Sequence, residues 1–229
     1  MTFFTALCAY KVVILRWNSY SKGNSAFPFH YNYIVHYYIM GDKEEEILAG
    51  RRVIKDRIAK PLTDGDIEKH TGQREILKYS DLKNYKTIED LLPADKSFVI
   101  ILIEDRLNSG HWVCVMRYGK TIEYFNSYGA KWDSDWKFIN KMVRMILGEN
   151  TNEMTRLMEG AKRDGWDTIW NKFRFQKLSS KIQTCGRHVV LRVEMMKMGY
   201  TLQEYYDFIK KREKELGEKS DFIVSKFVV

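Results

Sequence analysis

The feature that most constrains the fold is the apolar run FVIILIE at residues 98–104. A continuous run rich in β-branched residues predicts a central strand that is buried on both faces. Two more runs with strand character, residues 111–117 and 121–125, follow it and flank a short turn at residues 118–120. This spacing is typical of a β-hairpin. The middle of the chain therefore predicts a sheet with antiparallel neighbours.

Helical signals lie on both sides of these strands. Capping residues stand at Asp42, at Thr63 or Asp64, and at Thr201 with Glu204, which together form a capping box. The segments with helical signals are residues 40–58, 61–72, 85–93, 133–147, 151–163, 185–199 and 201–217, the last being the final helix. The combination predicts an α+β fold, in which helices flank a small, mainly antiparallel sheet.

The first 39 residues differ in character from the rest of the 229-residue chain. They are rich in aromatic residues and lack helical or strand periodicity, so residues 1–39 are interpreted as an N-terminal extension and residues 40–229 as the folded domain. Met40 is a candidate translation start, with an upstream read-through or an added arm before it. The alternative is a segment that packs on the domain. Lys11 interrupts the apolar opening, so neither a signal peptide nor a transmembrane helix is expected.

The charge of the chain leaves its partners open. The formal net charge is +8, and a basic surface favours polyanions such as nucleic acid. The basic residues are scattered, however, and ordinary solvated faces explain them as well as a binding groove does. One region contains Arg51, Arg52, Lys55, Arg57 and Lys60, and another contains Lys172, Arg174, Lys177 and Lys181.

The three cysteines point to free thiols. Cys8, Cys114 and Cys185 are an odd number without a CxxC pair, which argues against a disulfide scaffold and against a cysteine-rich zinc site. A reducing, intracellular setting fits this usage, and no metal is expected. Cys114 lies in mid-strand and is interpreted as a core residue. Cys185 begins a predicted helix, where unpaired N–H groups and the dipole lower the pKa of a thiol.

Cys185 has two candidate bases. In a symmetric hairpin, His111 and Asn126 face each other at the open end, where opposed Cβ atoms lie about 5 Å apart. The Asn126 amide oxygen can then accept the imidazole N–H and orient the ring. His188 is the rival, but it shares a helix with Cys185, and no second element brings it to the reacting carbonyl. The alternatives are a small buried cysteine and a strand-edge histidine bonded to backbone.

Acyl transfer also requires donors for the developing oxyanion. The backbone N–H of Cys185 is one candidate. A side-chain amide upstream of the cysteine is another, and Gln176 and Gln183 are the two residues available. Gly186, directly after the cysteine, leaves room for a substrate backbone to approach.

These residues resemble those of a known family. The series SGHW, EYFNSYG and TCGRHVV, at these distances, is similar to the adenovirus-type maturation proteases (adenain), which share a fold with the SUMO-specific proteases. The versions carried by virophages and other DNA viruses are the nearest in appearance. The resemblance covers roughly residues 47–210. It implies an adenain-like cysteine protease domain within residues 40–229.

The resemblance implies a role for each site residue. Cys185 is the nucleophile, His111 is the general base and then the acid, and Asn126 orients His111 where many members have Asp or Glu. The family's Gln usually stands six or seven residues before the Cys, where this chain has Ser179 and Leu178. Gln176 fits the aromatic-x-x-Gln context best, and Gln183 is the alternative. Trp112 is expected beside the imidazole, and Trp112 and Gly186 are expected to contact substrate.

The implied function is cleavage of viral capsid or core precursor proteins during virion maturation. The resemblance implies a monomer that needs no cofactor, with activation by DNA or a viral peptide, located in the virion and the host cell interior and not at a membrane. Three other functions use or replace the same residues. These are a deSUMOylase- or deubiquitinase-like isopeptidase, an effector-type acyltransferase, and a basic nucleic-acid-binding virion protein with a decayed triad.

Overall fold

The computed structural model describes residues 44–72 and 76–229, and it is an α+β fold built on one mixed sheet. The strand order is β1-β2-β3-β4-β5. The inner pairs β2–β3 and β3–β4 are antiparallel, and the outer pairs β1–β2 and β4–β5 are parallel. The strands are β1 (Leu77–Lys78), β2 (Phe98–Arg106), β3 (Ser109–Tyr118), β4 (Thr121–Asn126) and β5 (Asp167–Trp170). The predicted fold class is confirmed, and the parallel edges are an addition to it.

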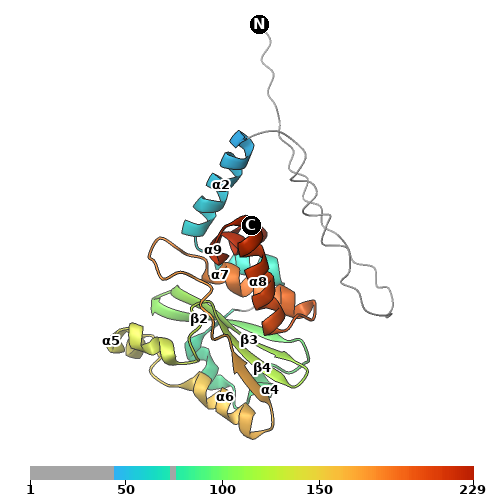
Figure 1. Ribbon diagram of the computed structural model, residues 1–229. Coiled ribbons are helices and arrows are strands. Elements are labelled where there is room, and N and C mark those ends of the chain that lie inside the picture. Colours follow the sequence, from blue (N-terminus) through green and yellow to red (C-terminus); the bar gives the residue numbers. More distant parts are fainter. Residues whose placement is uncertain (1–43, 73–75) are drawn as a thin grey trace, which may run out of the picture. The chain divides into compact units, whose positions relative to one another are not determined.

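Helices cover both faces of the sheet (Figure 1). On one side lie α7 (Cys185–Lys197), α8 (Leu202–Leu216) and α9 (Ser220–Phe227), and on the other lie α4 (Ile88–Leu91), α5 (Lys141–Ile146) and α6 (Glu153–Arg163). The remaining helices are α2 (Glu44–Ala59), α3 (Asp64–Thr71) and the 3-10 helices Tyr79–Asn84 and Ser134–Phe138. The hydrophobic core is accordingly divided into two layers by the sheet.

β2 contains an uninterrupted apolar run because its side chains pack in both layers of the core. Ile100 and Leu102 pack in the layer with α7, α8 and α9, and Ile101 and Ile103 pack in the layer with α4 and α6. Successive strand residues point to opposite faces, so burial on both sides requires apolar residues at every position. Cys114 in β3 is completely buried in the first layer, as expected of a core cysteine.

Several predicted helix boundaries are wrong. The single helix predicted at residues 133–147 is divided into the Ser134–Phe138 3-10 turn and α5, because Asn140 caps a new helix by accepting the Met142 N–H at 2.8 Å. The helix predicted at residues 201–217 is not the last, since α9 follows it. Asp42 and the proposed boundary between residues 39 and 40 lie outside the described residues.

A buried ion pair fastens α7 to the sheet. Arg192 of α7 donates two hydrogen bonds to Glu123 of β4, at 2.8 and 2.7 Å, and both side chains are 0% exposed. The Tyr118 hydroxyl donates a third hydrogen bond to this carboxylate at 2.6 Å. These contacts hold the helix that carries Cys185 at a fixed position on the sheet.

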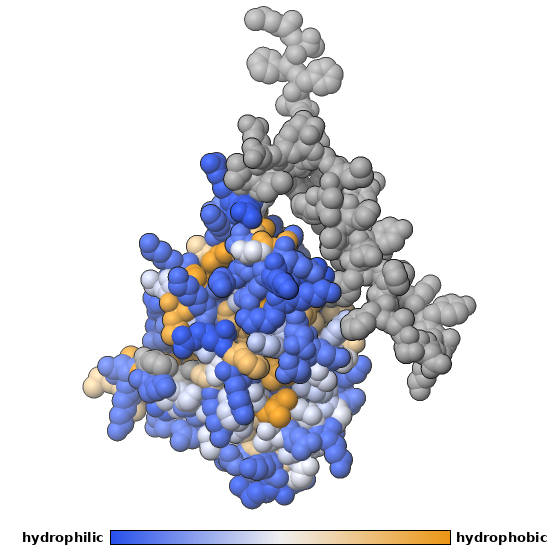
Figure 2. Space-filling view, viewed as in Figure 1, coloured by the Kyte–Doolittle hydropathy of each residue, from blue (hydrophilic) through white to orange (hydrophobic). Residues whose placement is uncertain are grey.

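The surface seen in Figure 2 is mostly hydrophilic, with small apolar areas between the hydrophilic ones. Within residues 44–72 and 76–229, the helices are too short or too polar to cross a membrane.

Candidate active site

The hairpin positions His111 and Asn126 differently from the predicted register. Tyr118 pairs with Thr121, so the loop contains only residues 119–120, and Val113 is the residue opposite Asn126. The predicted direct opposition of His111 and Asn126 is therefore wrong by two residues, because the turn is centred on residues 119–120, one residue later than that pairing requires. A two-residue shift keeps each side chain on its face, so His111 and Asn126 remain diagonal neighbours.

The two side chains bridge this diagonal with a hydrogen bond. His111 Nε2 lies 2.9 Å from Asn126 Oδ1. The same oxygen accepts the backbone N–H of Tyr128 at 2.9 Å. A backbone N–H can only donate, so the atom it meets must be the amide oxygen. His111 Nε2 is then the protonated nitrogen, and Nδ1 keeps its lone pair.

Two further contacts fix the position of the imidazole. The ring of Tyr128 stacks on His111, with centroids 4.4 Å apart and planes inclined at 18°. Gly110 precedes His111, and a Cβ at this position would overlap the Ile103 carbonyl of β2. Only glycine therefore fits at the entry to the strand that carries the histidine.

Asn171 holds the backbone of Asn126 and was not predicted. Its Oδ1 accepts the Asn126 N–H at 2.8 Å, and its Nδ2 donates to the Asn126 carbonyl at 2.6 Å. It is fully buried just beyond β5, where the β4–β5 ladder has ended. A single asparagine after a short apolar run is a weak sequence signal, and only the register of the strands reveals its partner.

Cys185 begins α7 and is 5% exposed. Burial tends to raise the pKa of its thiol. A hydrogen bond with His111, the positive charge of that imidazole when it has taken the thiol proton, and the backbone N–H groups of Trp112 and Gly186 outweigh burial, so the thiol pKa is lowered from its usual value. Since Nε2 of His111 is bonded to Asn126, Nδ1 is the nitrogen that remains for the thiol.

Trp112 and Gly186 are packed together beside the cysteine. A Cβ at Gly186 would lie 3.1 Å from Leu62 Cβ and 3.2 Å from Trp112 Cδ1. The indole N–H of Trp112 donates to the Leu62 carbonyl at 3.4 Å. Protein side chains thus occupy the space beside Gly186, and the expected contact of Trp112 and Gly186 with substrate stays a prediction.

The two candidate glutamines are in different environments. Gln176 is 1% exposed, its Oε1 accepts the Ser127 hydroxyl at 2.7 Å, and its Nε2 donates to the Ile182 carbonyl at 3.2 Å. It therefore lies between the segment that follows Asn126 and the segment that precedes Cys185. Gln183 is half-buried, and its amide donates locally to the Ser180 carbonyl at 3.1 Å.

His188, the rival base, points into the core. It is 0% exposed, and its Nε2 lies 3.3 Å from Asp221 Oδ1 in α9. Burial lowers its pKa, although the Asp221 carboxylate partly opposes this. His188 thus packs between helices, while His111 is the imidazole whose hydrogen bond reaches Cys185.

Comparison with known proteins shows that this chain is similar to a viral protein. The chain is 33% identical over 143 residues to the "Uncharacterized protein V9" of the Sputnik virophage. The match covers 62% of this chain and 79% of the virophage protein. The chain belongs to the V9 family. The expected relationship to a virophage protein is therefore confirmed.

Two solved structures are similar to this V9-family chain, and no family profile matches it. The SUMO protease Ulp1 with its catalytic cysteine oxidized to a sulfenic acid has a TM-score of 0.37 at 16% identity, over 83% of this chain and 96% of that chain. The form oxidized to a sulfinic acid has a TM-score of 0.35 at 16% identity, over 83% and 98%. Both scores are below 0.5, and no residue role is transferred from them.

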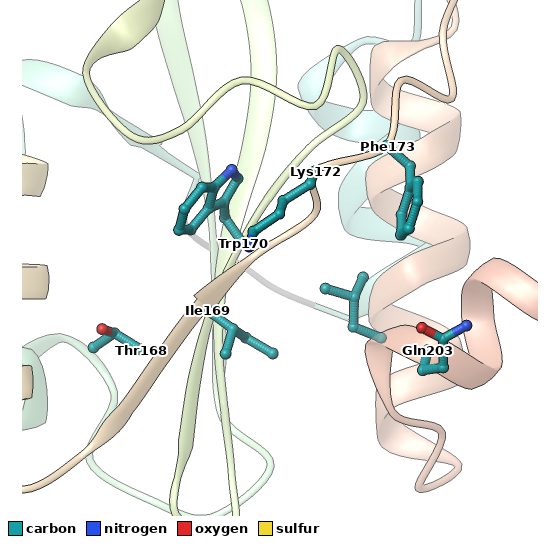
Figure 3. Close-up of a pocket in the computed structure, with 7 residues that line it drawn as sticks. Thr168, Ile169, Trp170, Lys172, Phe173 and Gln203 are labelled. Atoms are coloured by element: carbon teal, nitrogen blue, oxygen red, sulfur yellow. The ribbon is translucent and has the colours of Figure 1, made fainter.

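A shallow pocket lies beside the site of this V9-family chain, between β5 and α8 (Figure 3). It has a volume of about 350 Å³ and is lined by Thr168, Ile169, Trp170, Lys172, Phe173, Leu202 and Gln203. Trp170 and Lys172 flank Asn171, so the pocket borders the residue that holds Asn126 and does not contain Cys185. Among the described residues, no cluster of three or more His, Cys, Asp or Glu side chains is arranged to bind a metal.

Proposed function

We propose that this V9-family chain is a cysteine endopeptidase with Cys185, His111 and Asn126 as its catalytic triad. The observation that carries the proposal is the Tyr128 N–H on Asn126 Oδ1. It assigns the His111 proton to Nε2 and leaves Nδ1 to accept the thiol proton. Together with the lowered thiol pKa, this arrangement supplies a nucleophile and its base.

The proposed reaction proceeds in two steps. The Cys185 thiolate attacks a peptide carbonyl, and the Cys185 N–H and the Gln176 amide stabilise the oxyanion. The imidazolium of His111 then protonates the departing amine as the C–N bond breaks and a thioester remains. Water, deprotonated by His111, hydrolyses the thioester and releases the acid and the free thiol.

The proposed substrates are capsid or core precursor proteins of the virus. Membership of a family with a virophage protein supports a viral setting, and the resemblance to adenovirus-type proteases supports maturation as the process. The same resemblance supports a monomer that acts in the virion and the host cell interior, without a required cofactor.

The decisive experiment is incubation of the full chain with the viral precursors, followed by mapping of new termini. We expect Cys185→Ala to abolish cleavage while the fold is retained. The matched control is Cys114→Ala, which removes a buried thiol from the core and should leave cleavage in place. Undiminished cleavage by the Cys185→Ala chain would refute the proposal.

Two other activities would appear as distinct outcomes of the same programme. Release of a fluorophore from a ubiquitin-like C-terminus, without precursor cleavage, would indicate an isopeptidase. Nucleic-acid binding, without labelling of Cys185 by an electrophile at neutral pH, would indicate a non-enzymatic virion protein, because an ordinary thiol with a pKa of about 8.5 reacts slowly there.

The net charge of +8 supports activation by DNA as part of the proposal. We expect added DNA to raise the rate of precursor cleavage and added salt to reverse the gain, because salt weakens phosphate contacts steeply. The measurement is the cleavage rate with and without DNA at low and high salt. If added DNA does not change the cleavage rate at low salt, activation by DNA is refuted, and a viral peptide becomes the proposed activator.

A further inference from the structure

Within residues 44–72 and 76–229, three helices begin with a threonine that caps them. Thr63, Thr87 and Thr201 have ψ angles of 168°, 169° and 168°, and each hydroxyl accepts the N–H three residues further on. Each of these caps also forms a reciprocal capping box with an acidic side chain. A threonine at the N-cap position of this chain can thus cap its helix when it adopts the extended conformation.

The helix that carries Cys185 begins differently. Thr184 occupies its N-cap position with φ −102° and ψ 3°, and its side chain does not cap the helix. Its hydroxyl instead donates to Asp221 Oδ1 at 2.5 Å. Asp221 is the second residue of α9 and is only 5% exposed. Asp221, which is distant in the sequence, therefore binds the Thr184 hydroxyl, whereas the corresponding threonine hydroxyls cap α3, α4 and α8.

The start of α9 also holds the loop before the cysteine. Asp221 Oδ2 accepts the Lys177 N–H at 3.1 Å, and the Ser220 hydroxyl donates to the Phe175 carbonyl. These two contacts lie on either side of Gln176. The first turn of α9 thus anchors both Gln176 and the residue before Cys185.

The conformation of Thr184 has a direct effect on the site. Its ψ angle sets the direction of the next peptide N–H, which belongs to Cys185. The absence of a side-chain cap on α7 also leaves the positive end of the helix uncompensated near the sulfur. If Thr184 adopted the extended conformation of Thr63, Thr87 and Thr201, the peptide between Thr184 and Cys185 would rotate. The Thr184 hydroxyl oxygen would then accept the Arg187 N–H and cap α7.

We propose that Asp221 is a positioning residue for Cys185, which it serves by holding the Thr184 hydroxyl away from the N-terminus of α7. This inference rests on the proposed function of Cys185 as a nucleophile. Asp221 does not touch the reacting atoms. It acts through Thr184 on the direction of the Cys185 N–H and on the field at the sulfur.

The direction in which the pKa of the Cys185 thiol changes when Asp221 is replaced distinguishes the positioning role from a simple charge effect. The ionisable groups that act on the thiol are His111 from β3 and Arg187 from α7, and Asp221 with His188 lies behind the start of the helix. Loss of the negative charge of Asp221 alone would favour the thiolate and lower the thiol pKa. If Thr184 were released and capped α7, the positive charge at the helix N-terminus would be weakened, and the pKa of the Cys185 thiol would rise.

The test measures the alkylation of Cys185 by iodoacetamide against pH, followed on its own peptide by mass spectrometry in the full chain. We expect Asp221→Ala to move the midpoint of the curve of alkylation rate against pH to a higher pH, by about half a unit. The double variant Asp221→Ala with Thr184→Val should bring the midpoint back to the wild-type value or slightly below it, because valine cannot cap and the negative charge of Asp221 is also absent. Both variants should be less stable than the wild type, so stability alone does not account for the return.

Two more variants complete the test. Glu204→Ala removes the capping box of α8 and should lower the melting temperature without moving the midpoint. Asp221→Ser, which is too short to hold Thr184, replaces Asp221→Ala if that chain does not fold. An unchanged or lowered midpoint in the single Asp221 variants, or no return with Thr184→Val, overturns the inference alone. A wild-type midpoint of about 8.5, as in an ordinary thiol, overturns the proposed function as well.

Discussion

The backbone N–H of Tyr128 determines which nitrogen of His111 carries the proton. It reaches Asn126 Oδ1, and the orientation of this amide decides that His111 Nε2 donates. A carboxylate at position 126 would accept from both groups in the same way and would add a negative charge. An asparagine therefore keeps the orienting contact of the proposed triad and lacks the electrostatic support that a carboxylate would add.

Replacement of Gln176 and replacement of Gln183 should have different effects on catalysis. We expect Gln176→Ala to lower kcat by about 10²–10³-fold with a smaller change in KM, because an oxyanion donor acts mainly in the transition state. Gln183→Ala is the matched control and should change kcat little, since its amide bonds the nearby Ser180 carbonyl. Steady-state kinetics on a peptide substrate checks both, and a larger loss in Gln183→Ala would reverse the assignment.

At the scale of elements, the contact between β4 and α7 joins the two halves of the site. β4 ends at Asn126, α7 begins at Cys185, and the Glu123–Arg192 pair connects them. Both ions are shielded from water, so each depends on the other to offset its desolvation.

We expect Arg192→Met to destabilise the chain by about 3–5 kcal/mol, because it leaves the Glu123 carboxylate buried without its cation. The double variant with Glu123→Gln should recover part of this loss, since Tyr118 can still donate to the amide oxygen. Lys210→Met is the control, because Lys210 pairs with Glu213 at the surface, where such pairs contribute about 1 kcal/mol or less. Urea denaturation measures all three, and equal losses for Arg192→Met and Lys210→Met would contradict the prediction.

Elements that are buried on both faces or capped clearly were predictable from sequence. The run in β2, the apolar stripe of α7 and the Thr201 cap of α8 carry their own signals. β1 contains two residues and β5 is only partly buried, so neither shows a periodicity that identifies a strand. Parallel pairing at the sheet edges depends on the tertiary arrangement, which no local pattern contains.

The site was predictable to the extent that its residues are chemically distinctive. Cys185, His111 and Asn126 are found by residue type and order, although the register that joins the last two was wrong by two positions. Asn171 and Asp221 were missed because their effect passes through backbone groups and a threonine hydroxyl. Such partners are common residue types and are recognised only from the contacts of the folded chain.

At the scale of the whole molecule, an acidic cluster beneath the β2–β3 turn couples folding to pH. Glu149 accepts the Glu104 N–H through both oxygens, at 3.1 and 3.2 Å, next to a β-bulge. Burial, aided by the negative charge of Glu104, raises the pKa of Glu149 from 4.5 to about 7. The turn above this cluster leads directly into His111.

The contribution of Glu149 to stability should therefore fall as the pH rises from about 4.5 to about 7. In that window the folded chain holds a proton on Glu149 that the unfolded chain has lost, so rising pH favours unfolding. We expect Glu149→Gln to remove this contribution, so that the melting temperature of the variant rises relative to that of the wild type across the window and stays above it at pH values above 7. Glu68→Gln, in α3, is the control, and a Glu149→Gln profile parallel to that of the wild type would contradict the prediction.

The position of α9 also has a consequence for the order of synthesis. A ribosome makes His111 first, then Asn126, Gln176 and Cys185, and only afterwards the Ser220 and Asp221 pair that anchors the loop and Thr184. On the proposed function, a nascent chain that has emerged as far as the cysteine still lacks the groups that set its nucleophile. On the two proposals together, proteolytic competence is delayed until translation has passed residue 221.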